Sequence, residues 1–303
     1  MPTILGQRIR DRQFVITAEI VPPLSATPDL LLEEAALLRG KAHAINITDG
    51  AGGKTSISSF AASAILAANG FEPVLQVTCR DRNRIALAAD LIGASAQGVH
   101  NVLMLRGDDP RSGDQPDAKP VFDLESADLM RIAREMRDRG VLPSGRTIDP
   151  APNFFLGGAD VPREPDAKFR TEGLRAKAEA GAQFVQTQFC FDPGLARRYL
   201  ARLNDDGITK SIGFILGVGP IASARSARWM NEHLFGVHVP ETVIARLEGA
   251  ADPAAEGIRH CAELIHELRE IPGIAGVHLM APVGGVQAIA QVLSQAGLDA
   301  ASA

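Results

Sequence analysis

Short apolar runs alternate with longer amphipathic stretches along nearly the whole chain, in the order typical of strands and helices. Eight runs predict strands, at residues 14–20, 44–48, 73–79, 101–107, 153–156, 184–189, 212–218 and 276–281. Each is followed by a stretch that predicts a helix, at residues 29–39, 56–68, 83–95, 124–139, 167–180, 193–203, 222–231 and 286–296. Two further helical stretches, 240–247 and 254–268, precede the last strand.

This alternation indicates a parallel sheet, because parallel strands need a crossover connection between them. Residues 102–105 and 214–216 are apolar at successive positions, as expected of strands covered on both faces. We therefore predict an α/β fold of the (β/α)8 TIM-barrel type, with residues 1–303 forming a single catalytic domain. An open doubly wound sheet also alternates, but it usually has a glycine-rich phosphate loop after its first strand, where this chain has Val21, Pro22 and Pro23.

Composition and charge narrow the range of functions. The chain has 303 residues, 46% of them hydrophobic, which is enough for a large core. A net charge of −5 argues against broad binding to nucleic acid or to an anionic membrane. No signal-peptide pattern and no apolar run of ~20 residues is seen, and Cys79, Cys190 and Cys261 form no disulfide set, so the cytoplasm is expected. The histidines form no ligand cluster, so no metal is expected, and His278 is expected in the core or in support of a neighbour.

Polar residues at strand ends are the candidates for chemistry, because a parallel barrel places its active site at the carboxyl ends of its strands. Glu19 shares a strand face with Val15 and Thr17, and desolvation there would disfavour its charged form, which suits a general acid. The alternative is an exposed carboxylate or one paired with an arginine. Asp108 would point into the barrel mouth, where it could stabilise a cation or bind an amine-rich ring. The alternative there is a solvated acidic turn with Asp109.

Two further segments have weaker patterns. Gln188 ends the sixth predicted strand with an amide that can donate and accept, as needed to bind the edge of a lactam-and-amine ring. A buried glutamine bonded to the backbone is the alternative. Residues 48–55 are glycine-rich, but only two residues separate Gly50 from Gly53, so the spacing of a triphosphate-binding loop is missing. We expect a flexible loop whose backbone can approach a flat cofactor.

Six strings, taken together and in order, resemble the methylenetetrahydrofolate reductase family. They lie at residues 17–23 (TAEIVPP), 46–51 (NITDGA), 77–79 (VTC), 105–108 (LRGD), 119–124 (KPVFDL) and 186–192 (QTQFCFD), and they cover nearly the whole chain. The resemblance implies a folate oxidoreductase of one-carbon and methionine metabolism. Such an enzyme interconverts 5,10-methylenetetrahydrofolate and 5-methyltetrahydrofolate, with FAD relaying a hydride from NADH or NADPH.

The resemblance also implies roles for individual residues. Glu19 would protonate folate N10, Asp108 would stabilise the resulting iminium cation, and Gln188 would hydrogen-bond the pterin. The residues expected at the flavin are Thr48, Ala51, Gln76, Arg106, Gly107, Asp108 and Lys177.

Some expected contacts to the flavin are changed in this chain. The family commonly has tyrosine at Asp49 and histidine at Gln76. Its polar helix residues are replaced at Arg170, Gly173 and Ala176, and the phenylalanine that flanks the folate matches Ala224. These departures predict that flavin is held weakly, is held differently, or is bypassed by direct hydride transfer from a nicotinamide.

Two other functions stay open at this point. One is a folate-dependent methyltransferase-type barrel without redox chemistry. The other is a reductase subunit that needs a redox partner protein. Formation of a homo-oligomer also stays open.

Overall fold

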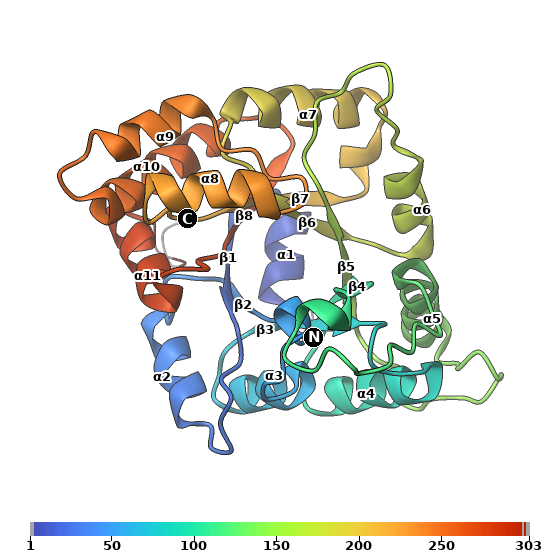
Figure 1. Ribbon diagram of the computed structural model, residues 1–303. Helices are drawn as coiled ribbons and strands as arrows, with labels where there is room; N and C mark the ends of the chain where they lie inside the picture. The colour runs from blue at the N-terminus through green and yellow to red at the C-terminus, as the bar shows by residue number, and fades with distance from the viewer. Residues whose placement is uncertain (1–2, 299, 301–303) are drawn as a thin grey trace.

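Eight parallel strands close into a barrel in the order of the chain, as the computed structural model of residues 3–298 and 300 shows (Figure 1). Each strand pairs with its neighbours in sequence, and β1 pairs with β8 to complete the ring. The predicted TIM-barrel class is confirmed. The strands are β1 (Val15–Ile20), β2 (Ala44–Ile47), β3 (Pro73–Thr78), β4 (Asn101–Leu105), β5 (Phe155–Asp160), β6 (Phe184–Phe189), β7 (Gly213–Val218) and β8 (Ile274–Leu279).

All the described helices except α1 lie on the outside of the barrel, and two of them, α9 and α10, are the predicted additions before the last strand (Figure 1). None in the described part of the chain combines the length and apolar character needed to cross a membrane. The helices are α1 (Ile4–Arg10), α2 (Asp29–Leu37), α3 (Ser59–Ala68), α4 (Arg84–Ala96), α5 (Ser126–Arg139), α6 (Glu172–Ala180), α7 (Pro193–Asp205), α8 (Ala224–His233), α9 (Glu241–Glu248), α10 (Pro253–Arg269) and α11 (Gly285–Gln295), with short 3-10 turns η1 (Ala51–Gly53), η2 (Pro110–Ser112) and η3 (Ile208–Lys210).

The fifth strand is the largest error of position in the prediction. It was expected at residues 153–156, but β5 spans Phe155–Asp160. Its inward-facing Gly157 hid the pattern, because a glycine contributes no apolar side chain. A Cβ at Gly157 would lie 2.2 Å from Cζ of Phe184, so the missing side chain makes room for that ring, which stacks on Phe155.

Helix α1, which the sequence pattern did not predict, closes the amino-terminal end of the barrel. It lies inside the ring of strands in Figure 1. Leu5 on α1 is fully buried against the inward-facing residues of the strands, including Phe155 and Phe184. The Glu72 carboxylate accepts hydrogen bonds from the backbone N–H groups of Ile4 and Leu5, both at 2.7 Å, so it caps the helix from β3's side. This end of the barrel is therefore filled by packed side chains.

Inward-facing residues change from apolar to polar along the barrel axis. Side chains two residues apart on a strand share a face. On β1 the inward series is therefore Val15, Thr17 and Glu19, and on β6 it begins with Phe184 and continues to Gln186. The apolar members form a closed cluster at the amino-terminal end. The polar members point toward the carboxyl ends of the strands, where a parallel barrel builds its active site.

Stability at acid pH depends on His43, which is buried beside β1. Its Nδ1 accepts a hydrogen bond from the backbone N–H of Ile16 at 2.9 Å, so the imidazole is neutral in the folded protein. Burial, reinforced by the charge of Arg8, lowers the pKa of His43 from 6.5 to about 4. In the unfolded chain the ring takes up its proton near pH 6.5, so between pH 6.5 and 4 the unfolded state binds more protons and stability falls as pH falls.

We expect the wild-type free energy of unfolding to decrease between pH 6.5 and 4 more steeply than that of His43→Asn, which keeps an acceptor but does not titrate. Urea unfolding at several pH values in this window measures the two slopes. Parallel slopes for the two proteins would show that His43 does not carry this dependence.

Candidate active site

A cleft of about 960 Å³ opens at the carboxyl ends of the strands. Loops after most of the strands contribute to its walls. Every residue predicted from the sequence as catalytic, folate-binding or flavin-binding lines this one cleft: Glu19, Thr48, Ala51, Gln76, Arg106, Gly107, Asp108, Lys177 and Gln188. The structure thus brings together residues that are spread over 170 positions of sequence (19 to 188).

A layer of buried amides forms the floor of the cleft. Asn46 on β2 and Gln186 on β6 exchange two hydrogen bonds across the barrel, at 2.5 and 2.9 Å. The Gln186 amide also donates to Thr17 Oγ1 at 3.2 Å, and Thr17 in turn contacts Nδ1 of His278 at 3.0 Å. All four side chains are buried. Because every polar group in this layer has a partner, the floor is rigid, and it separates the apolar end of the barrel from the polar mouth.

Three of these four residues, Thr17, Asn46 and Gln186, were not predicted from the sequence to be part of the site. His278 was expected in the core or in a supporting role, and it does support the floor while also lining the cleft. A signal existed for Asn46 and Gln186: each lies two residues before a predicted site residue, Thr48 and Gln188, on the same face of its strand.

Glu19 stands on this floor with its carboxylate in the cleft. Its side chain is 21% exposed, so the carboxylate is shielded without being sealed off. Gln76 Nε2 donates to Glu19 Oε2 at 3.4 Å, and His278 Nε2 lies 3.6 Å from the same oxygen. Within the described residues Glu19 makes no ion pair with lysine or arginine, so the alternative of an arginine-paired carboxylate does not hold. The Gln76 amide can donate a hydrogen bond to this carboxylate without neutralising its charge.

Asp108 lies on the exposed rim of the cleft. It is therefore less enclosed than expected from the sequence, which predicted that it points into the barrel mouth. Its Oδ2 accepts a hydrogen bond from the backbone N–H of Gly52 at 3.0 Å, which joins the end of β4 to η1. The neighbouring Asp109 turns away to pair with Arg111, and this hydrogen bonding lowers the pKa of Asp109 to about 2. The two adjacent carboxylates therefore differ: Asp108 faces the ligand cleft and Asp109 belongs to the outer turn.

Gln188 is half-buried at the end of β6. Its Oε1 accepts a hydrogen bond from the backbone N–H of Phe189 at 2.9 Å. For the amide oxygen, the alternative prediction of a glutamine bonded to the backbone is therefore correct. Among the described residues its amide nitrogen has no hydrogen-bond partner, and the side chain lines the cleft. Gln188 can therefore donate to a ligand, whereas accepting would require it to turn.

Cations and one orphaned hydroxyl complete the walls. Arg80, Arg106, Arg163 and Lys177 line the cleft, and the carboxylates Glu19, Asp49, Asp108 and Asp160 line it as well, so the cleft offers charges of both signs to a ligand. Lys177 Nζ donates to the carbonyl oxygen of Ala159, and burial lowers the pKa of this lysine. Thr48 Oγ1 is buried without a hydrogen-bond partner in the described part of the chain, so this hydroxyl is available to a ligand in the cleft.

The residues present do not fit a tightly held flavin. Asp49, where the family commonly has tyrosine, accepts from the Thr78 N–H at 2.8 Å, the Thr78 hydroxyl at 2.9 Å and the Ser59 hydroxyl at 3.0 Å, and it pairs with Arg82. These bonds tie it to the fold. On α6 the two changed positions carry only a hydrogen and a methyl group, at Gly173 and Ala176. Of the polar contacts expected from this helix only Lys177 is retained, and its ammonium already bonds to the backbone.

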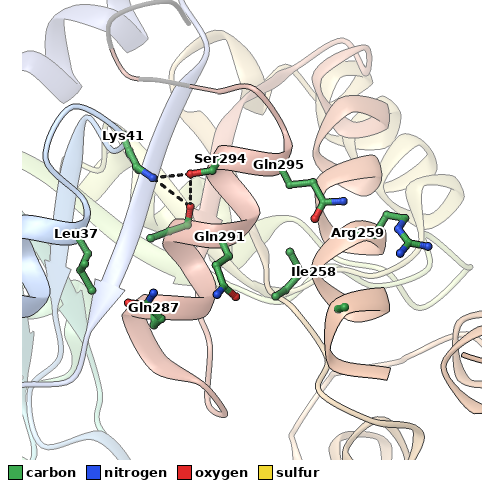
Figure 2. A pocket seen from close by; sticks show the side chains of 10 residues that line it. Leu37, Lys41, Ile258, Arg259, Gln287, Gln291, Ser294 and Gln295 are labelled. Carbon is green, nitrogen blue, oxygen red and sulfur yellow. Dashed lines mark hydrogen bonds between the residues drawn. The ribbon is translucent and has the colours of Figure 1, made fainter. Parts of the chain in front are cut away.

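A second groove lies on the outside of the barrel between α2, α10 and α11. Figure 2 shows Lys41 donating to Ser294 and to the carbonyl oxygen of Ala290, with Gln287, Gln291 and Gln295 along α11. No carboxylate or histidine is among its lining residues. It lacks the groups for proton transfer that the cleft at the strand ends contains.

The fold and this cleft define a parallel-barrel protein whose acid, amide and cationic groups meet at the carboxyl ends of the strands. The model of the methylenetetrahydrofolate reductase family matches residues 4–297, and the chain belongs to that family. This confirms the resemblance found in the sequence.

Named relatives agree with this membership. The probable methylenetetrahydrofolate reductase (NADPH) of Caenorhabditis elegans is 26% identical over 89% of this chain and 40% of the nematode protein. The 5,10-methylenetetrahydrofolate reductase of Salmonella typhimurium (strain LT2) is 24% identical over 80% of this chain and 76% of that protein. The chain spans about 40% of the length of the nematode protein and of a fission-yeast relative.

Among solved structures, an uncharacterised protein from Clostridium thermocellum has the same fold, with a TM-score of 0.66 and 16% sequence identity. The match covers 96% of this chain and 97% of the other. That protein is described as binding two copies of 5-methyl-5,6,7,8-tetrahydrofolic acid.

The floor can be tested by removing one amide or both. Gln186→Met leaves the buried amide of Asn46 unpaired, and we expect it to cost roughly 1–3 kcal/mol of unfolding free energy. Adding Asn46→Leu removes the orphaned group, so the double variant should recover much of that loss. Urea unfolding measures all three proteins. A double variant as unstable as the sum of the two single variants would contradict the pairing.

Proposed function

We propose that this chain is a folate oxidoreductase that interconverts 5,10-methylenetetrahydrofolate and 5-methyltetrahydrofolate, with its barrel as the catalytic domain. The observation that carries the proposal is the position of Glu19, a carboxylate without a cationic lysine or arginine partner in the described structure, on the polar floor of the cleft. Family membership supplies the class of reaction. Asp108, Gln188 and Thr48 on the same cleft supply the other polar contacts that a folate needs.

The first step of this reaction requires an acid. Protonation of folate N10 breaks its bond to the bridging methylene carbon and leaves an iminium cation at N5. Glu19 is the group we assign to this proton, since its carboxyl stands in the cleft, where Gln76 Nε2 donates to it at 3.4 Å and His278 Nε2 lies 3.6 Å away. In the reverse direction the same carboxylate removes the N10 proton.

The cation that forms needs an anion nearby. Asp108 meets this need from the rim of the cleft, where the N–H of Gly52 fixes its carboxylate. A fixed charge requires no rearrangement when the cation appears, which is the source of its advantage over water. Gln188, with its amide nitrogen available, orients the pterin by donating a hydrogen bond.

The reduction itself transfers a hydride to the methylene carbon. NADH or NADPH supplies the hydride and its two electrons, and the nicotinamide is oxidised while the iminium becomes a methyl amine. We propose that this transfer is direct, because the residues around Asp49 and α6 do not fit a tightly held flavin. The exposed Arg106 and Arg163 on the cleft suit the phosphates of the dinucleotide and the carboxylates of the folate.

Glu19→Gln should lower turnover by roughly 10²–10⁴-fold and keep folate binding, because the amide preserves shape but cannot deliver the proton. Anaerobic assays with 5-methyltetrahydrofolate or its methylene form measure turnover, and equilibrium binding measures affinity. Unchanged turnover in this variant would remove Glu19 from the mechanism.

Asp108→Asn should reduce the rate of the chemical step more than it reduces folate affinity, since the charge acts on the cation and not on the neutral substrate. Single-turnover kinetics separate the two quantities. A loss confined to affinity would contradict the assignment of Asp108 to the cation.

The protein should purify with substoichiometric flavin or with none, because Asp49 is bonded into the fold and Gly173 and Ala176 on α6 offer no polar contact. Absorbance after dialysis measures the flavin content directly. A stable yellow protein that absorbs at about 450 nm, a wavelength typical of a bound flavin cofactor, and that holds one flavin per chain would show that the site holds flavin after all.

A further inference from the structure

His278 is a buried titratable side chain of the cleft to which the proposed mechanism gives no role. It lies on β8, its side chain is 4% exposed, and Thr17 is its direct partner where β8 pairs with β1. Glu19 follows Thr17 by two residues on the same face of β1. The ring therefore reaches both residues: Nδ1 lies 3.0 Å from Thr17 Oγ1, and Nε2 lies 3.6 Å from Glu19 Oε2.

The hydrogen bonds around Thr17 indicate which ring nitrogen of His278 holds the proton. Thr17 Oγ1 accepts from the Gln186 amide nitrogen at 3.2 Å and has one proton of its own to donate. Donation to Nδ1, at 3.0 Å, leaves the ring proton on Nε2. The other acceptor within reach is the carbonyl oxygen of Val277 at 3.4 Å, which is a longer and weaker bond. The shorter bond favours the neutral ring with Nε2–H directed at Glu19.

Two N–H groups then face the same oxygen of Glu19. Gln76 Nε2 lies 3.4 Å from Oε2, and His278 Nε2 lies 3.6 Å from that atom. The second distance exceeds that of a formed hydrogen bond, and catalytic contacts of this kind commonly shorten only when substrate binds. Among the described residues Oε1 of Glu19 has no hydrogen-bond partner, and Glu19 lines the cleft. Oε1 is therefore the oxygen available to a substrate.

We propose that His278 is a positioning residue for Glu19: with Gln76 it occupies Oε2 through an N–H group and so confines the acidic proton to Oε1, where folate N10 can receive it. This rests on the proposed function. A proton on Oε2 would face two N–H groups, whereas a proton on Oε1 leaves Oε2 free to accept from both. The chain of hydrogen bonds from Gln186 through Thr17 sets the tautomer of His278, and the tautomer sets the acid.

The same arrangement stabilises Glu19 after the proton has left. The Oε1–H bond breaks as the N10–H bond forms, and the electron pair of the bond between N10 and the methylene carbon stays on N10 while the N5 iminium forms. The carboxylate that remains carries a negative charge, and the N–H groups of Gln76 and His278 donate to it. Because these donors are already in place, their contribution grows as the charge develops.

A second buried histidine beside β1 provides a matched control. His43 Nδ1 accepts from the backbone N–H of Ile16 at 2.9 Å, so this ring also bonds to the strand that holds Glu19. It does not line the cleft. His43→Asn therefore removes a buried imidazole next to the same strand without touching the acid.

The kinetic test compares His278→Asn with His278→Gln. The longer glutamine can place its amide nitrogen where Nε2 lies and donate to Glu19, whereas asparagine reaches only the position of Nδ1 beside Thr17. We expect His278→Asn to lower the single-turnover rate of 5,10-methylenetetrahydrofolate reduction by about 10–100-fold, as loss of a hydrogen bond to a charged group predicts. His278→Gln should stay within about fivefold of wild type, and both variants should bind folate within about threefold of it. His43→Asn should react as wild type does.

The tautomer is measured in the wild-type protein by nitrogen-15 NMR after labelling of the histidines, with His278→Gln identifying the signals of His278. We expect a protonated Nε2 and an unprotonated Nδ1 at neutral pH. This measurement needs neither turnover nor a variant other than the one used for assignment. It therefore decides the proposal even if His278→Asn fails to fold.

The outcomes separate the two proposals. Equal losses of rate in His278→Asn and His278→Gln would show that the ring only fills space, and a loss of folate affinity as large as the loss of rate would place its effect in binding. A wild-type ring protonated on Nδ1 alone, or on both nitrogens, would remove the donor tautomer. Each of these results overturns the role of His278 and leaves the reductase proposal standing. A wild type without turnover overturns the reductase proposal and, with it, the role of His278.

Discussion

The pair of amides that spans the barrel, Asn46 on β2 and Gln186 on β6, determines where chemistry can occur in this protein. Below the pair the interior is apolar and closed by α1, with Leu5 packed on Phe155 and Phe184. Above it the interior is polar and open. Two reciprocal hydrogen bonds satisfy groups that would otherwise be costly to bury, and they let the barrel change from core to site within one layer of side chains.

The loops above this floor are held by bonds that leave little freedom. Gly52 binds Asp108, Asp49 is engaged by Thr78, Ser59 and Arg82, and the N–H of Thr55 binds the carboxylate of Asp114. These contacts join the ends of β2, β3 and β4 into one wall. The opposite wall, after β5 to β7, has the exposed Phe235 and the amide nitrogen of Gln188, which has no hydrogen-bond partner among the described residues, so that side is the more open to a flat ligand.

Much of the fold could be predicted from the sequence because each strand is a run of apolar residues bounded by helix signals; α7, for example, begins at Asp192 and Pro193. The fifth strand was misplaced because Gly157 and Gly158 interrupt its apolar pattern. Helix α1 was missed although Thr3 caps it locally, because its 7 residues are too few to show a helical period. The candidate site followed from strand ends and family strings. The alternation along β2 and β6 could have placed Asn46 and Gln186 on the inward face, but their pairing across the barrel is a tertiary contact without a local pattern.

The central claim is that this cleft passes a hydride from a nicotinamide straight to the folate methylene carbon. Deuterium tracing tests it most directly. Flavin-free protein is incubated anaerobically with 5,10-methylenetetrahydrofolate and with NADH or NADPH that carries deuterium at the position from which hydride is transferred. The methyl group of the product is then analysed by mass spectrometry. Direct transfer predicts one deuterium retained in the methyl group of 5-methyltetrahydrofolate. Loss of the label to solvent, or product that forms only after flavin is added, would contradict the account.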